Sequence, residues 1–126
     1  MSRNFRWPGL PADFGYLGIP QVFLDQSYTF KPDDNGKKFV HTSATAHTWT
    51  FDANTPYPDD FTVTVINHTG AGTLTVQVIG GNMTMYLANG AAGSRTLTAN
   101  NIATFAFYRI VTGAAFFMAS GSAGLT

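Results

Sequence analysis

The pattern that most constrains this chain is the alternation of threonine with large apolar residues in short runs. The clearest case is FTVTVI at 61–66, followed after the turn NHTGAG by TLTVQVI at 73–79. A period of two places successive side chains on opposite faces of a strand. The pair of runs predicts an antiparallel β-hairpin with one apolar and one threonine-rich face. The predicted inward-facing residues are Phe61, Val63, Val65, Leu74, Val76 and Val78.

Similar runs recur along the rest of the chain. At 47–51 the alternation predicts that Trp49 and Phe51 share a core-facing side. The segment KPDDNGK contains a proline and an Asn-Gly pair, so it is expected to reverse the chain between strands at 27–30 and 38–42. With about eight or nine strands and no helical periodicity, the sequence predicts an all-β antiparallel β-sandwich, jelly-roll-like in its strand spacing. The remaining predicted strands are 82–87, 95–98, 102–109 and 114–119.

The two ends of the chain differ from its middle. At 126 residues the chain has the length of one domain. Prolines and glycines are frequent in the first 22 residues, and they predict an extended N-terminal arm over 1–22. The β-sandwich domain is then expected over 23–121. The tail 122–126 has little to bury, so it is predicted to be flexible or docked on a partner.

The surface is predicted to be almost neutral. Charged residues make up 11% of the chain, against about 25% in an ordinary soluble domain, and seven basic residues balance seven acidic ones. Because an isolated domain usually needs net charge to stay dispersed, neighbouring chains are expected to cover this surface. The same balance argues against a nucleic-acid partner, which requires a basic stripe. No run is apolar enough for a membrane span, and the first residues lack an export-signal pattern, so assembly in a cytoplasm is expected.

The motifs of catalysis and metal binding are not evident. The chain contains no cysteine, and the adjacent aspartates at 33–34 and 59–60 stand beside prolines, as turn formers do. They also lack the alternating spacing of a calcium loop. Neither a nucleophile motif nor a phosphate-binding glycine loop is present, so we expect neither enzymatic activity nor a cofactor. No strand or helix spacing places two of the three histidines on one ligand face; these are His41, His47 and His68.

Three segments resemble small virion proteins of tailed bacteriophages, namely capsid decoration (cement) proteins and the compact heads of tail fibres. They are FKPDDNGKKFV at 30–40, FTVTVINHTGAGTLTVQVIGG at 61–81 and ATFAFYRIVTGAAFFMASGSAG at 103–124. The resemblance spans residues 24 to 121. This chain departs from the pattern of those proteins in its closing strand. Similar proteins often carry a tryptophan there, whereas this chain has Phe116 and Phe117.

The resemblance implies a β-sandwich or jelly-roll, assembly as a homotrimer, and binding to other virion proteins or to a host surface. The leading hypothesis is a capsid decoration protein on the capsid surface that bridges and stabilises subunits of the major capsid protein. The alternative is a tail-fibre or receptor-binding head that recognises a host surface glycan, for which an exposed aromatic groove is expected.

The N-terminal arm carries the predicted partner-binding residues. Its large apolar residues lack the alternation of a strand, so something outside the arm must bury them. Arginine and tryptophan are over-represented among interface hot spots, and Trp7 stands close to two arginines. The alternative is that the arm folds back over its own domain. The predicted residues are Arg3, Phe5, Arg6, Trp7, Leu10, Phe14, Tyr16 and Leu17.

Overall fold

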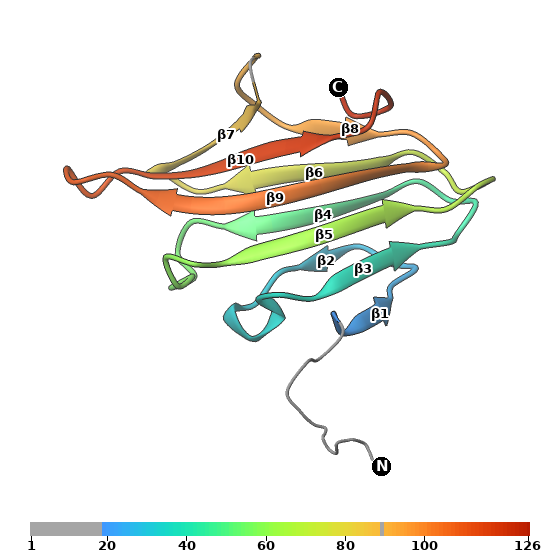
Figure 1. The fold of residues 1–126 in the computed structure, drawn as a ribbon, viewed down its shortest axis with the longest axis horizontal. Coiled ribbons are helices and arrows are strands. Elements are labelled where there is room, and N and C mark those ends of the chain that lie inside the picture. Colours follow the sequence, from blue (N-terminus) through green and yellow to red (C-terminus); the bar gives the residue numbers. More distant parts are fainter. Residues whose placement is uncertain (1–18, 89) are drawn as a thin grey trace, which may run out of the picture.

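The computed structural model describes residues 19–88 and 90–126, and this part of the chain is almost entirely β-structure (Figure 1). The all-β prediction is confirmed. The first strand begins at Gln21, so two residues assigned to the arm belong to a sheet. Besides the 3₁₀ turn η1 (Pro32–Asp34), the elements are β1 (Gln21–Phe23), β2 (Tyr28–Thr29), β3 (Lys38–His41), β4 (His47–Asp52), β5 (Thr62–Asn67), β6 (Leu74–Ile79), β7 (Met83–Leu87), β8 (Arg95–Leu97), β9 (Asn101–Arg109) and β10 (Ala115–Gly121).

The strands form two mixed sheets. One has six strands in the order β1-β3-β5-β9-β10-β7, and the other has four in the order β2-β4-β6-β8. From β1 to β9 the chain alternates between the sheets, so strands two apart in sequence become neighbours. As a result β1, β3 and β5 run parallel, as do β2, β4 and β6. β9 is antiparallel to β5 and β10, while β7 pairs with β10 in parallel. The prediction of purely antiparallel sheets is therefore wrong, although β6 and β8 also pair antiparallel.

The segments 61–66 and 73–79 are not the predicted hairpin. β5 lies in the six-stranded sheet and β6 in the four-stranded sheet, and the turn between them carries the chain from one to the other. The predicted inward faces are nevertheless observed, because two sheets packed on one core bury the same alternate residues as a hairpin would. Trp49 and Phe51 are fully buried, as predicted. Of the inward set, Phe61, Val63, Val65, Leu74 and Val76 are buried and Val78 is partly buried.

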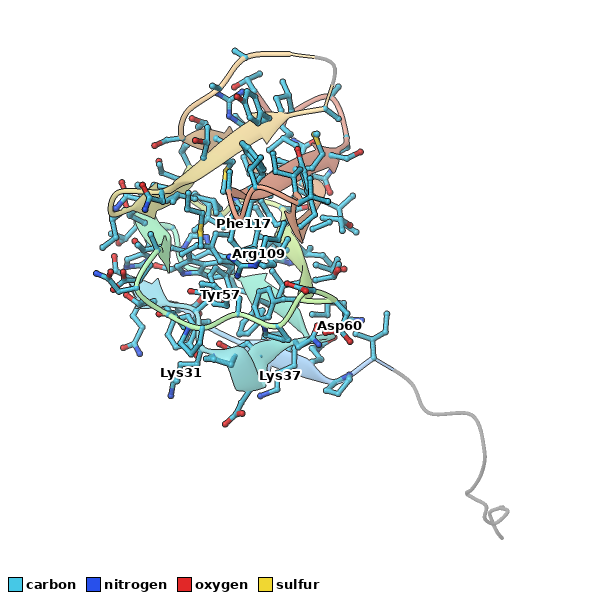
Figure 2. The ribbon with its side chains drawn as sticks, turned by 90° about the vertical axis from the view of Figure 1, so that its left-hand side faces the viewer. Lys31, Lys37, Tyr57, Asp60, Arg109 and Phe117 are labelled. Atoms are coloured by element: carbon cyan, nitrogen blue, oxygen red, sulfur yellow. The ribbon has the colours of Figure 1, made fainter. Side chains whose placement is uncertain are left out.

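The core is most aromatic at one end of the strands, which we call the Tyr57 end; Figure 2 looks onto it. Phe51 of β4 stacks on Phe117 of β10, with ring centroids 3.9 Å apart, and on Phe30, 4.5 Å away. Tyr57 lies in the loop between β4 and β5, and its hydroxyl donates to the carbonyl oxygen of Phe30 at 2.7 Å. These contacts join the two sheets, and each aromatic pair contributes about 0.5–1.5 kcal/mol beyond its burial.

The tail 122–126 is docked on the chain itself rather than flexible. Thr126 exchanges two backbone hydrogen bonds with Thr96 of β8, both 2.9 Å long. Leu125 is 7% exposed and belongs to the core. The prediction of a flexible tail is wrong because this one leucine reaches the core and fixes the residues around it. The tail also pairs backbone groups of β8 that an open sheet edge would leave unpaired.

Candidate functional site: the outer face of the six-stranded sheet

The eight predicted partner-binding residues, from Arg3 to Leu17, lie outside the described residues. Within residues 19–88 and 90–126, no three histidine or aspartate side chains gather as they would around a metal ion. The same part of the chain contains no helix long and apolar enough to cross a membrane. The outer faces of the two sheets differ in composition.

The outer face of the four-stranded sheet is polar and carries little charge. The strand register places Thr48 beside Thr75, and Thr75 beside Thr96, so a row of threonines crosses three strands. The Gln77 amide donates to the Thr50 hydroxyl at 3.2 Å. Threonine is favoured on a half-exposed strand surface, and hydroxyl groups are readily hydrated. This face has the composition of one that stays in contact with water.

The outer face of the six-stranded sheet carries a row of apolar side chains at one end. In the register of the sheet, Phe23 lies beside Val40, Val40 beside Ile66, and Ile66 beside Ile102. Phe23 is 65% exposed and Ile102 is 45% exposed. Val40 is only 8% exposed, although it alternates with the core residue Phe39 and so points outward. We call Phe23, Val40, Ile66 and Ile102 the apolar row.

A shallow depression of about 280 Å³ lies beside the apolar row and is lined in part by Ile66 and Ile102. Two asparagines in its wall are already bonded within the protein. The Asn101 oxygen accepts from the Ser122 hydroxyl at 2.7 Å, and the Asn67 oxygen lies 2.7 Å from His41 Nδ1. His68 and Asn100 also line the depression, beside the aliphatic side chains of Ile66 and Ile102.

A buried polar network lies beneath this end of the sheet. The Asn67 amide nitrogen donates to the carbonyl oxygens of Gly72 and Leu97, which fixes the orientation of its oxygen toward His41. His41 Nδ1 must then carry a proton and donate, so in the neutral ring Nε2 accepts. His47 Nδ1 lies 2.8 Å from that Nε2, and with both rings neutral it donates to it. His41 and Asn67 are fully buried.

This contact was missed at the level of sequence, where no strand or helix spacing placed two histidines together. His41 ends β3 and His47 begins β4. The short turn between these strands brings the centroids of the two imidazole rings to 5.1 Å from each other. Their position on either side of one turn was the available signal. The same turn is held by Asp25. The pKa of Asp25 is lowered by hydrogen bonds from the Thr42 hydroxyl and backbone amide, and from the Ser43 amide.

Aromatic side chains line up at the other end of the same outer face. Tyr108 of β9 lies directly beside Phe116 of β10, with ring centroids 5.2 Å apart and planes at 24°. Tyr86 of β7 lies 5.9 Å from Phe116 on the other side. Tyr108 is 36% exposed, and the other two rings are partly exposed. We call Tyr86, Phe116 and Tyr108 the aromatic ladder.

A larger depression of about 490 Å³ adjoins the ladder, and Phe116 forms part of its wall. It lies between the β6–β7 turn, β7 and the β9–β10 turn, and we call it the ladder hollow. The side chains of Asn82, Thr84 and Thr112 line it. Among the described residues these three side chains have no hydrogen-bond partner, unlike the amides beside the apolar row. No charged side chain of the described residues lines this hollow.

Several charged side chains lie on the loops of the Tyr57 end, the same end of the strands as the ladder hollow, where Figure 2 shows Lys31, Lys37, Asp60 and Arg109. The Tyr28 hydroxyl donates to the buried Asp34 carboxylate at 2.7 Å. Burial, followed by this bond and the charge of Asp34, raises the pKa of Tyr28 well above its usual range. Burial is also the main cause that raises the pKa of Tyr57.

Comparisons with protein-family models, with curated proteins and with solved structures find no match for this chain. The resemblance to phage virion proteins therefore stays a prediction. The surfaces just described are the observations on which a function is proposed.

Proposed function

We propose that the chain is a non-enzymatic structural protein of a virus particle. In this proposal it is a capsid decoration protein that bridges and stabilises subunits of the major capsid protein, and its two sheets form a β-sandwich related to the jelly-roll. The observation that best supports this is the apolar row. It is a stripe of apolar side chains across four neighbouring strands, exposed at Phe23 and Ile102, on a chain that carries only 11% charged residues.

The apolar row has the chemistry of a protein contact. Interface centres are apolar and depleted of charged residues, whereas the rim is polar. The strip beside the row fits a rim, since Lys38 lies next to Thr64 and Thr64 next to Thr104. The row also begins on β1, the strand that directly follows the predicted arm. We propose that the arm and the row contact the same partner, and that the chain assembles as a closed homotrimer.

The location of the protein in a purified particle tests this proposal. Quantitative mass spectrometry should find copies in proportion to the coat subunits, and cryo-electron microscopy should place threefold density on the capsid surface. A few copies at the tail tip would favour a receptor-binding head instead. Absence from purified particles would refute a structural role in the virion.

A charge placed on the apolar row tests the contact itself. Ile66→Asp and Ile102→Asp should each weaken binding to empty shells about thirtyfold, which corresponds to a hot-spot loss of about 2 kcal/mol. Thr75→Asp, at a partly exposed site on the opposite sheet, is the matched control and should bind like the unaltered protein. Melting temperatures would verify that all three variants fold. Equal binding by row and control variants would contradict the proposal.

One observation favours a second candidate function. The aromatic ladder is the kind of exposed aromatic surface expected of a tail-fibre or receptor-binding head that recognises a host glycan. The ladder and the apolar row lie at opposite ends of one face, so the two candidate functions predict different contact residues. Variants at each end can therefore separate them.

A further inference from the structure

We infer that the ladder hollow is a binding site for a neutral glycan. The inference is independent of the decoration role proposed above, because it concerns other residues and another class of ligand. It deepens the second candidate function and rests on the same aromatic ladder. It is drawn from three features of the hollow: its aromatic wall, its unbonded polar side chains, and its lack of charge.

The aromatic wall suits one side of a sugar ring. A pyranose presents C–H groups on its faces and hydroxyl groups around its edge, so it needs an apolar surface and polar groups close together. Phe116 supplies apolar surface within the hollow. Tyr108 and Tyr86 extend that surface to both sides, at 5.2 and 5.9 Å from Phe116. Both also carry hydroxyl groups without a hydrogen-bond partner among the described residues, and a tyrosine with such a polar end is favoured at wet contacts.

The polar side chains suit the edge of the ring. The amide of Asn82 can donate and accept, and the hydroxyl groups of Thr84 and Thr112 can do the same. All three are free to bond a ligand within the described structure. Gly81 and Gly113 also line the hollow, and a Cβ atom built on either of them would meet nothing within 4 Å. The backbone there is open to a ligand.

The absence of charge sets the class of sugar. Buried or partly buried charges on a ligand need a counter-charge or several hydrogen bonds. The nearest cation of the β9–β10 hairpin, Arg109, instead bonds Asp59 at 3.4 Å and the Gly113 carbonyl oxygen at 3.4 Å. A neutral hexose or N-acetylhexosamine therefore matches the hollow better than a sialylated or sulfated sugar.

The ladder hollow also differs from the apolar row, which has the chemistry of a protein contact. At the row, the amides of Asn67 and Asn101 are bonded within the protein, and the exposed side chains of the row are apolar. At the ladder, the depression is larger, about 490 Å³, and its polar groups are unbonded. This volume lies within the range of about 300–1,000 Å³ found for small-ligand sites. A concave site with convergent free polar groups is what a small polar ligand requires.

Saturation-transfer NMR on the full-length protein, followed by titration calorimetry, tests the inference. The probes are neutral hexose and N-acetylhexosamine oligosaccharides, together with sialylated and sulfated counterparts. We expect saturation transfer to at least one neutral oligosaccharide at millimolar concentration. Tyr108→Ala and Asn82→Ala should each weaken that binding at least tenfold. Ile102→Ala on the apolar row is the matched control and should bind the sugar normally.

Three outcomes would overturn the inference: no binding of any neutral probe, binding of acidic glycans alone, or equal binding by ladder and row variants. If the ladder variants lose shell binding and no sugar binds, the hollow is a protein contact and the inference is wrong. The decoration proposal is tested separately, since Ile102→Asp should weaken shell binding about thirtyfold and leave sugar binding intact.

Discussion

The two ends of the molecule are closed by different chemistry. At the Tyr57 end, aromatic rings from both sheets fill the core, with Phe51 stacked between Phe30 and Phe117. At the opposite end, hydrogen bonds among His41, Asn67 and His47 replace such packing. Stacked rings stabilise the fold through the apolar area that they bury. A buried polar network stabilises it only while each member keeps its hydrogen-bond partners. The two ends should therefore respond differently to substitution and to pH.

The largest effect is expected from a cavity at the Tyr57 end. Phe117→Ala should lower the free energy of unfolding by about 3–5 kcal/mol, because it removes a fully buried ring from the aromatic stack. Phe116→Ala is the matched control, since this adjacent ring points outward and should cost less than about 1.5 kcal/mol. Urea denaturation would measure both. Similar losses for the two variants would show that the packing at this end is not as described.

A somewhat smaller loss is expected at the other end. Asn67→Leu keeps the side chain's approximate size but removes the acceptor for His41 and the donor to the Gly72 and Leu97 carbonyls. Leaving such buried groups unpaired should cost about 2–4 kcal/mol. Asn82→Leu, at an exposed asparagine without partners among the described residues, is the control and should change stability by less than about 0.5 kcal/mol. If Asn67→Leu left the free energy of unfolding unchanged, packing rather than hydrogen bonding would hold this end together.

Alkaline pH should loosen the Tyr57 end first. The pKa values of Tyr28 and Tyr57 are raised above the usual phenol value of 10.0. A group with a raised folded-state pKa contributes its full stability below the unfolded-state value, and the contribution is lost as pH rises above it. The melting temperature should therefore fall above pH 10, and phenolate absorbance should show two tyrosines ionising late. In Tyr28→Phe the melting temperature should fall less steeply above pH 10. An unchanged pH profile in this variant would contradict the role given to Tyr28.

The alternation in the sequence was enough to predict which residues face the core, but not which strands pair. Apolar residues alternate with a period of two whether two successive strands form a hairpin or a turn carries the chain to another sheet. Parallel neighbours usually require a long crossover. Here the crossover between β3 and β5 is β4 itself, a strand of the opposite sheet. Nothing within FTVTVI or TLTVQVI distinguishes the two arrangements.

The candidate sites depend on this pairing, which explains why they were not found in the sequence. Tyr86, Tyr108 and Phe116 become neighbours only because β7, β10 and β9 lie side by side. The apolar row likewise takes one residue from each of four strands. The sequence predicts that partners cover a neutral surface, and this stays a prediction. The predicted contacts of the arm await a test of their own.

The smallest effect is expected at Asp25, which lies on the surface at the end opposite the Tyr57 end, near His41. Its carboxylate accepts hydrogen bonds from Thr42 and Ser43, and these lower its pKa below the usual 3.8. A group with a depressed folded-state pKa contributes stability above its unfolded-state value, and this is lost as pH falls through the folded-state value. Hydrogen exchange at the Thr42 and Ser43 amides should therefore show protection that declines below pH 3.8.

Asp25→Asn tests this dependence with little change in shape. Its amide oxygen can still accept one backbone bond, but it has no charge to lose, so protection at 42–43 should be weaker at neutral pH and nearly constant on acidification. Asp33→Asn, in the η1 turn at the other end, is the control and should leave the profile at 42–43 unchanged. If Asp25→Asn kept the acid-dependent loss of protection, the titrating group would lie elsewhere, and the carboxylate would not be what holds the β3–β4 turn.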